Sequence, residues 1–191
     1  MKNLLIYILI VLPIFAFAQG TISFKLTPQA TFSTASNEDF IIVPFENKSA
    51  HEIYQTLASN IGSLYNNPSK VMNGVEDTSI KIRSIIPISQ KTTKVIMLGE
   101  VLIEINGFIQ YDIKIKHGRA KVSAPFIENY IWIDGGASSN FPNLVSQWFK
   151  HEKKEKKRME NMQNIIELEN RVNTIINSIL GLNKPSEEDN W

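Results

Sequence analysis

The sequence predicts an α+β fold, with an antiparallel sheet covered on one face by a helix and followed by a long C-terminal helix. Three observations lead to this class. A capping box followed by apolar residues at helical spacing predicts a helix over 50–65. From residue 79 onward apolar residues recur at every second position, as in strands that bury one face and expose the other. An apolar stripe over 159–182 then returns to helical spacing.

The first eighteen residues, MKNLLIYILIVLPIFAFA, have the composition of a signal peptide. Lys2 supplies the positive charge, a nearly uninterrupted apolar stretch follows, and Ala16-Phe17-Ala18 matches the small-x-small cleavage pattern. The stretch is shorter than the roughly 20 residues that a bilayer span needs. We therefore expect a mature chain that begins at Gln19, has no transmembrane span, and is periplasmic or extracellular. An uncleaved anchor and a buried strand are the alternatives.

Composition excludes several classes of site. Removal of Lys2 with the leader leaves 20 − 1 = 19 basic residues against 19 acidic ones, so the mature chain is formally neutral. Proteins that bind nucleic acids usually carry a basic excess, and no nucleic acid is expected as a partner. The chain has no cysteine, which excludes a disulfide framework, a thiol nucleophile and a lipidated cysteine. Export without disulfides fits the bacterial envelope.

The segment 19–38 is polar, with one candidate strand at TISFKL, and leads into a domain expected over 39–140. FIIVPF reads as a strand. Ser49 and Glu52 form the capping box of the helix that follows, and its apolar face carries Ile53, Leu57, Ile61 and Leu64. Asn66-Asn67-Pro68 ends this helix, because the residue before a proline disfavours helical backbone.

The strands follow in SIKIRSI, GEVLIEIN and FIQYDIKIK. Asn106-Gly107 predicts a hairpin turn, since both residues tolerate positive φ, and His117-Gly118 predicts another. Alternation points one set of side chains inward and the other outward. The inward set is Ile109, Tyr111, Ile113 and Ile115, and the outward set is Gln110, Asp112, Lys114 and Lys116.

This arrangement resembles small exported bacterial proteins described as a domain of unknown function with a TATA-binding-protein-like (TBP-like) fold. The residues that carry the resemblance are VPFENKSAHEIYQTLASNIGSLYNNPSKVM and GFIQYDIKIKHGRAKVS, within about residues 39–130. The resemblance implies a TBP-like α+β domain and transfers no catalytic residues. Proteins that bend DNA through such a sheet present basic residues and apolar wedges. The outward face here is mixed, and fold alone does not imply function.

Catalytic and metal-binding motifs are sparse, and we predict no catalytic residue, no metal site and no cofactor. The three histidines, His51, His117 and His151, lie in a capping box, a turn and a charged segment. His151-Glu152 begins like H-E-x-x-H, but Glu155 occupies the second ligand position. Tyr130, Trp132 and Asp134 share one side of a strand, where they would stack on sugars or, as we prefer, cover the start of the C-terminal helix.

The sequence predicts a single helix over 141–182, with Asn140 before it and Gly181 at its end. Residues 150–158 hold six basic and two acidic side chains and no apolar one, which is typical of a solvated spacer or a flexible connector. The later half carries an apolar heptad pattern. Its candidate interface residues are Ile165, Leu168, Val172, Ile175, Ile179 and Leu182. Self-association, packing back onto the sheet and binding of another protein all remain open. An acidic tail over 183–191 ends the chain.

The sequence therefore predicts an exported, non-catalytic binding or assembly protein of the bacterial envelope. We expect it to bind a protein partner or to self-associate through the C-terminal helix. An envelope hydrolase that uses carboxylates is the alternative, and nucleic-acid binding is a weaker one. The sequence names neither the ligand nor the partner.

Overall fold

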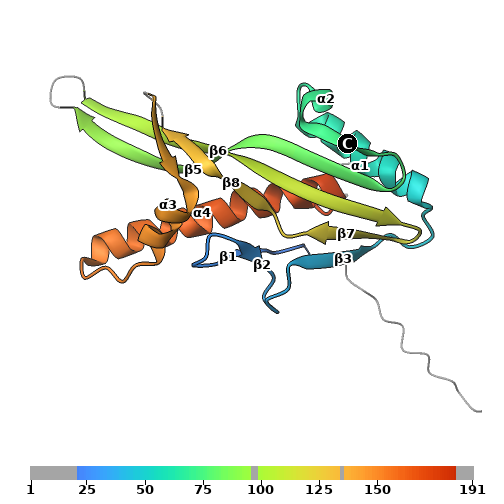
Figure 1. Cartoon of the computed structure of the whole chain (residues 1–191), viewed down its shortest axis with the longest axis horizontal. Coiled ribbons are helices and arrows are strands. Elements are labelled where there is room, and N and C mark those ends of the chain that lie inside the picture. Colours follow the sequence, from blue (N-terminus) through green and yellow to red (C-terminus); the bar gives the residue numbers. More distant parts are fainter. Residues whose placement is uncertain (1–20, 96–98, 134–135, 184–191) are drawn as a thin grey trace, which may run out of the picture.

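A seven-stranded antiparallel sheet forms the centre of the molecule, and a long helix runs along it (Figure 1). The computed structural model describes residues 21–95, 99–133 and 136–183. The predicted signal peptide at 1–18 and the tail beyond Asn183 lie outside the described residues. The predicted α+β class, antiparallel sheet and long C-terminal helix are confirmed.

The described residues form strands and helices in the following chain order: β1 (Lys25–Leu26), β2 (Phe32–Ser33), β3 (Phe40–Pro44), α1 (Ala50–Leu64), α2 (Pro68–Val71), β4 (Met72–Val75), β5 (Ser79–Val95), β6 (Gly99–Lys116), β7 (Arg119–Ser123), β8 (Phe126–Ile133), β9 (Ala137–Asn140), α3 (Phe141–Phe149) and α4 (Glu155–Leu180). β1 and β2 form a separate two-stranded sheet, and the large sheet has the order β3-β7-β6-β5-β4. β8 pairs with both β6 and β9.

The predicted hairpin turn at Asn106-Gly107 is wrong, because β6 runs through both residues as one strand of 18 residues. The apolar alternation is unbroken there: Ile105, Gly107 and Ile109 all face the core. A Cβ on Gly107 would lie 3.0 Å from Ile131 Cγ2 of the neighbouring strand. This glycine therefore permits close packing inside the sheet. The predicted turn at Gly118 is confirmed, with φ of 73°.

Helix α1 begins as predicted. Ser49 accepts a hydrogen bond from the Glu52 backbone N–H, and the Glu52 side chain accepts one from the Ser49 backbone N–H. Ile53, Leu57 and Ile61 of this helix are fully buried against the sheet, whereas Leu64 is 42% exposed and does not join them. The Glu52 carboxylate accepts hydrogen bonds from Ser49, and these bonds lower the pKa of Glu52.

The predicted single helix over 141–182 is wrong, because the structure has two helices, α3 and α4, with residues 150–154 between them. The break falls in the lysine-rich run. Helices in proteins depend mainly on the burial of an apolar face, and this run has none to bury. Lysines three and four positions apart also repel one another in a helix. The run is a connector that lets α4 turn back along the sheet (Figure 1).

Residues 21–26, which we call the N-terminal strap, are bound to α4 and are more than a lead-in. Ile22, Phe24 and Leu26 are buried on the helix side. Their backbone groups pair with side chains spaced four residues apart on α4. Asn177 accepts from the Ile22 N–H at 2.7 Å and donates to its carbonyl at 2.8 Å. Asn173 does the same for Phe24, at 2.8 and 2.9 Å.

The third rung of this ladder is Glu169. One carboxylate oxygen accepts the Leu26 N–H at 2.9 Å, and the other accepts from the Lys25 ammonium at 2.9 Å. Buried backbone groups need partners, and a helix offers none from its own backbone to a neighbouring strand. The amide and carboxylate side chains of α4 therefore take the place of an adjacent β-strand. This arrangement explains why three polar residues lie on an otherwise apolar side of the helix.

The substitution Asn177→Ala is expected to destabilise the protein by about 2 kcal/mol or more, because it leaves a buried N–H and a buried carbonyl of Ile22 without partners. The free energy of unfolding by urea measures this. Asn170→Ala, on an exposed position of the same helix, is the matched control and should change stability by no more than a few tenths of a kcal/mol. Equal stability of the two variants would contradict the ladder.

Candidate functional site

The face of the sheet opposite the helices carries an unusual number of exposed apolar and aromatic side chains. Ile85 of β5 and Tyr130 of β8 are each 60% exposed, and Ile42 of β3 is 47% exposed. Side chains alternate along each strand, so these residues lie opposite the buried set that faces α1 and α4. Contiguous exposed apolar patches, unlike single exposed residues, often mark sites of interaction.

Phe108, Tyr130 and Trp132 form what we call the aromatic platform. Phe108 of β6 and Trp132 of β8 lie with ring centroids 5.3 Å apart and planes tilted by 53°. The guanidinium of Arg83 lies over the Phe108 ring, with Cζ 3.5 Å from the ring centroid. Cationic groups are attracted to the negative face of an aromatic ring. The platform thus combines ring faces from β6 and β8 with a fixed cation from β5.

Arg83 is held in place by Glu128 through two parallel hydrogen bonds. Its Nε donates to Oε1 at 2.6 Å, and its Nη2 donates to Oε2 at 3.0 Å. Gln110 donates a third hydrogen bond to Glu128 Oε1 at 2.9 Å. Such a bidentate pair fixes both planar groups, so their remaining donors and acceptors are presented in a defined geometry.

The charges of this pair are mutually stabilised. The hydrogen bond from Arg83 lowers the pKa of Glu128, and the hydrogen bond from Gln110 lowers it further. The same bond to Glu128 raises the pKa of Arg83. Glu128 is therefore ionised at neutral pH and acts as a hydrogen-bond acceptor. A carboxyl group that must donate a proton in catalysis needs the opposite shift.

The prediction for Tyr130 and Trp132 needs a correction. We expected these residues to cover the start of the C-terminal helix, but Tyr130 is largely exposed and Trp132 packs on Phe108. Helix α3 buries Phe141, Leu144, Val145 and Trp148 instead. The exposure of Tyr130 leaves the sugar-stacking alternative as a prediction. Asp134, the acid considered with them, lies outside the described residues.

Sequence reasoning missed Arg83, Phe108 and Glu128. The position of Phe108 in the alternating pattern could have indicated it. Phe108 lies between buried residues of β6 and therefore shares the opposite face with Gln110. Arg83 and Glu128 are separated by 45 residues, and only the pairing of β5, β6 and β8 brings them together.

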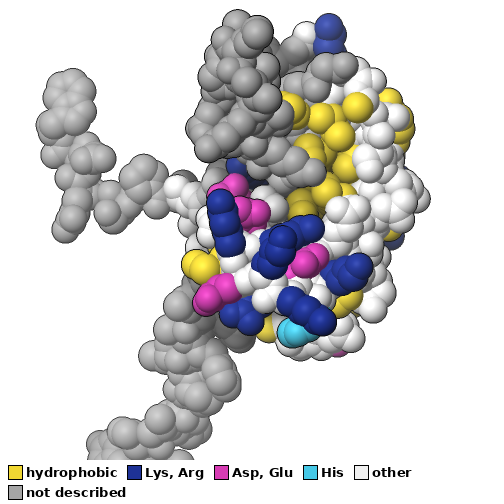
Figure 2. Space-filling view, turned by 90° about the vertical axis from the view of Figure 1, so that its left-hand side faces the viewer, with side chains coloured by type: hydrophobic (Ala, Val, Ile, Leu, Met, Phe, Trp, Pro, Cys, Tyr) yellow, Lys and Arg dark blue, Asp and Glu magenta, His cyan; other side chains and the backbone are white. Residues whose placement is uncertain are grey.

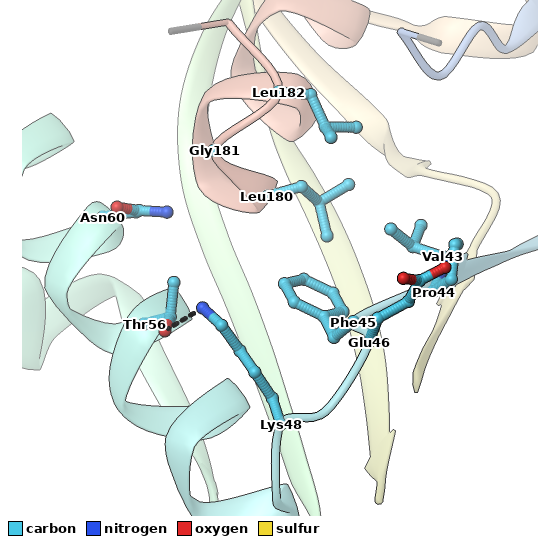
Figure 3. A pocket seen from close by; sticks show the side chains of 10 residues that line it. All are labelled: Val43, Pro44, Phe45, Glu46, Lys48, Thr56, Asn60, Leu180, Gly181 and Leu182. Atoms are coloured by element: carbon cyan, nitrogen blue, oxygen red, sulfur yellow. Dashed lines mark hydrogen bonds between the residues drawn. The ribbon is translucent and has the colours of Figure 1, made fainter. Parts of the chain in front are cut away.

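A pocket lies where the β3–α1 connection, α1 and the end of α4 meet (Figure 3). It has a volume of about 600 Å³ and is lined by Val43, Pro44, Phe45, Glu46, Lys48, Thr56, Asn60, Leu180, Gly181 and Leu182. Lys48 Nζ donates to Thr56 Oγ1 at 3.4 Å, and this hydroxyl donates to the Glu52 carbonyl at 2.7 Å. The threonine is thus not activated as a nucleophile. Asn60 is used to bind the Ile179 carbonyl.

One group of side chains in the described ranges has the spacing of a metal site. The ligand atoms of His51, Glu76 and Asp77 lie within 4.8 Å of one another. His51 Nδ1 is 2.9 Å from Asp77 Oδ1 and 3.9 Å from Glu76 Oε1, and its Nε2 is 2.7 Å from Gln55 Nε2. A neutral ring that donates from Nδ1 and accepts at Nε2 satisfies both contacts. These bonds tie the β4–β5 turn to the start of α1.

The six candidate interface residues of the C-terminal helix lie within the chain's own core. Leu168, Val172 and Ile179 are fully buried, and Ile165, Ile175 and Leu182 pack against the same core. Of the three arrangements left open, packing back onto the sheet is therefore the one observed. The buried hydroxyl of Tyr111 in β6 also donates to the Val172 carbonyl at 3.2 Å. Burial raises the pKa of Tyr111 well above its usual value.

A scan against protein-family models finds no match, and a search of curated proteins finds none either. Among solved structures, a DUF4468 family protein from Bacteroides ovatus ATCC 8483 matches with a TM-score of 0.49 and 11% identity, over 78% of this chain and 87% of that one. A TBP-like protein from Parabacteroides distasonis ATCC 8503 matches with a TM-score of 0.45 and 12% identity, over 76% and 92%.

This chain is similar to both proteins. Their descriptions agree with the resemblance to TBP-like domains of unknown function. At these scores the likenesses carry no conclusion about ligand or activity. Within the described ranges, no helix is both long enough and apolar enough to span a bilayer.

The contribution of Glu128 to stability is expected to depend on pH. Its pKa is lowered in the folded state from a reference value of 4.5, so ionisation stabilises the fold above that value and the contribution is lost as pH falls through the folded pKa. Thermal unfolding of Glu128→Gln should therefore differ from wild type at neutral pH and converge with it in acid. Glu160→Gln, an exposed position on α4, is the control. A difference that is constant with pH would contradict the assignment.

Proposed function

We propose that the protein is an exported, non-catalytic binding protein of the bacterial envelope, and that its aromatic platform binds carbohydrate. The observation that carries the proposal is a group of rings, the exposed Tyr130 and the half-buried Phe108 and Trp132, beside the fixed Arg83–Glu128 pair. A sugar ring has an apolar C–H face that packs on aromatic side chains. Its hydroxyl groups at the edge both donate and accept hydrogen bonds, and guanidinium, amide and carboxylate groups supply the partners.

The geometry supports binding over hydrolysis. Glycoside hydrolysis commonly needs two carboxyl groups, one of which has a raised pKa so that it can donate a proton. Glu128, the carboxylate that binds Arg83 beside the platform, is also bound by Gln110 and has a lowered pKa. It can accept hydrogen bonds from a ligand but is a poor proton donor. This argues against the carboxylate hydrolase that composition left as the alternative.

The place of the N-terminal strap supports export. Cleavage after Ala18 would leave Gln19, Gly20 and Thr21 ahead of Ile22, the first buried residue of the strap. The cut would therefore leave the N-terminal strap and its hydrogen bonds to α4 intact. The absence of cysteine in the sequence agrees with a compartment where folding does not depend on disulfides.

Binding of the chain from Gln19 to Trp191 to insoluble peptidoglycan and to cellulose tests the carbohydrate proposal. Co-sedimentation with at least one of them is expected, and Tyr130→Ala should weaken it about tenfold, since the loss of one stacked ring removes roughly 1–1.5 kcal/mol. Phe149→Ala replaces an exposed ring on another element, the end of helix α3, and is the matched control. Binding that Tyr130→Ala does not weaken would place the ligand elsewhere. No binding by wild type would oppose a sugar ligand and favour a protein partner for the platform.

Export has a separate test. The chain expressed with its leader should be recovered from the periplasmic or extracellular fraction, and its N-terminal sequence should begin at Gln19. Ala18→Arg, which removes the small residue before the cut, should leave the leader attached. Recovery of an unprocessed wild-type chain in the cytoplasm would overturn this part of the proposal and leave the carbohydrate test unaffected.

A further inference from the structure

Positive charge gathers at the end of the molecule where α3 is joined to α4. We call residues 150–158, KHEKKEKKR, the basic end; they hold six basic and two acidic side chains, a net charge of +4, so the rest of the formally neutral mature chain carries 0 − 4 = −4. All of them except Glu152 are exposed. Figure 2 looks at this end of the molecule and shows Lys and Arg side chains grouped there, with hydrophobic side chains beside them.

Most of this charge is free to meet a partner. Glu152 pairs with Lys157 at 3.6 Å, and Glu155 lies 3.9 Å from Arg158. Both acidic side chains of the basic end therefore form ion pairs within it. Among the described residues, no ion pair involves Lys150, Lys153, Lys154 or Lys156.

Large apolar side chains are exposed at the same end. Met159 is 62% exposed, Met162 59% and Ile166 41%, and their spacing of three and four residues puts them on one side of α4. Phe149, at the end of α3, is 39% exposed. Asn161 donates to the Gln147 carbonyl at 3.1 Å and so holds the end of α3 against α4. Exposed apolar side chains therefore flank the basic end in the chain, Phe149 directly before it and Met159 directly after it.

The same side of α4 is covered farther along the helix. Its stripe continues from Met159, Met162 and Ile166 to Glu169, Asn173 and Asn177, at spacings of three or four residues. The N-terminal strap binds the second half of that stripe and reaches no farther than Glu169. The first half is left to solvent, next to the basic end.

We propose that the basic end, together with Phe149, Met159, Met162 and Ile166, binds the surface of an anionic phospholipid bilayer. Unpaired ammonium groups complement the phosphate groups of such a surface. Flexible apolar side chains beside them can enter the boundary between headgroups and acyl chains, as in interfacial amphipathic helices. A nucleic acid would match the positive charge, but it would offer no apolar contact to the exposed side chains of Met159, Met162 and Ile166. The contact would be peripheral and reversible, and it is independent of the carbohydrate proposal.

The test is co-sedimentation of the chain from Gln19 to Trp191 with vesicles. This chain keeps every described residue and lacks the apolar segment 1–18, which would partition into vesicles by itself. The probes are vesicles of phosphatidylcholine alone and of phosphatidylcholine mixed with phosphatidylglycerol. We expect binding to the mixed vesicles only, with an affinity that falls as salt is added.

The variants separate the contribution of this surface from that of overall charge. Replacement of Lys150, Lys153, Lys154 and Lys156 by glutamine should weaken binding about tenfold or more. The control replaces four exposed lysines elsewhere, Lys70, Lys81, Lys114 and Lys116, and should change binding much less. Met159→Ser with Met162→Ser should reduce the part of the binding that persists at high salt.

Three outcomes would overturn the proposal. One is the absence of binding to the mixed vesicles. Another is equal loss of binding in the two lysine variants, which would show an effect of net charge alone. The third is binding to a DNA duplex that requires the four lysines of the basic end, without binding to vesicles. Circular dichroism spectra that match wild type would show that each variant is folded.

Discussion

Strand β6 pairs with β5 from Gly99 to Lys114, and on its other side it pairs with β8 over 105–110 and with β7 over 113–116. The core and the aromatic platform both depend on the alternation of its side chains. Its odd-numbered residues from Ile105 to Ile115 fill the core under α1 and α4. Its even-numbered residues include Phe108 and Gln110, which build the aromatic platform and its hydrogen bonds. A shift of one residue would exchange the core and the platform.

This constraint explains which features of the fold were open to prediction. The alternation from Ile109 to Ile115, the capping box at Ser49 and the turn at Gly118 are local patterns, and each was predicted correctly. The prediction of a turn at Asn106-Gly107 was wrong because it relied on a local turn preference. The longer alternation of apolar residues determined the structure here. The period continues through Gly107 at odd-numbered positions, and this was visible in the sequence.

The features that escaped prediction join residues far apart in the chain. Nothing near Ile22 indicates that its backbone will pair with the side chain of Asn177, 155 residues later. The Arg83–Glu128 pair likewise exists only because three strands meet. The apolar stripe of α4 was recognised, but a stripe alone does not say what covers it. Its buried positions pack on the chain's own sheet, and its first turns remain exposed beside the basic end.

The hydrogen bonds between the strap and α4 join segments from opposite ends of the chain, which has a consequence for the order in which the protein folds. Ile22, Phe24 and Leu26 leave the ribosome 143 to 155 residues before their partners Glu169, Asn173 and Asn177. Contacts of such large sequence separation form slowly, because a long loop must close first. The native core therefore cannot be completed before α4 has been synthesised. A chain with this connectivity stays incompletely folded until its C-terminal helix is available.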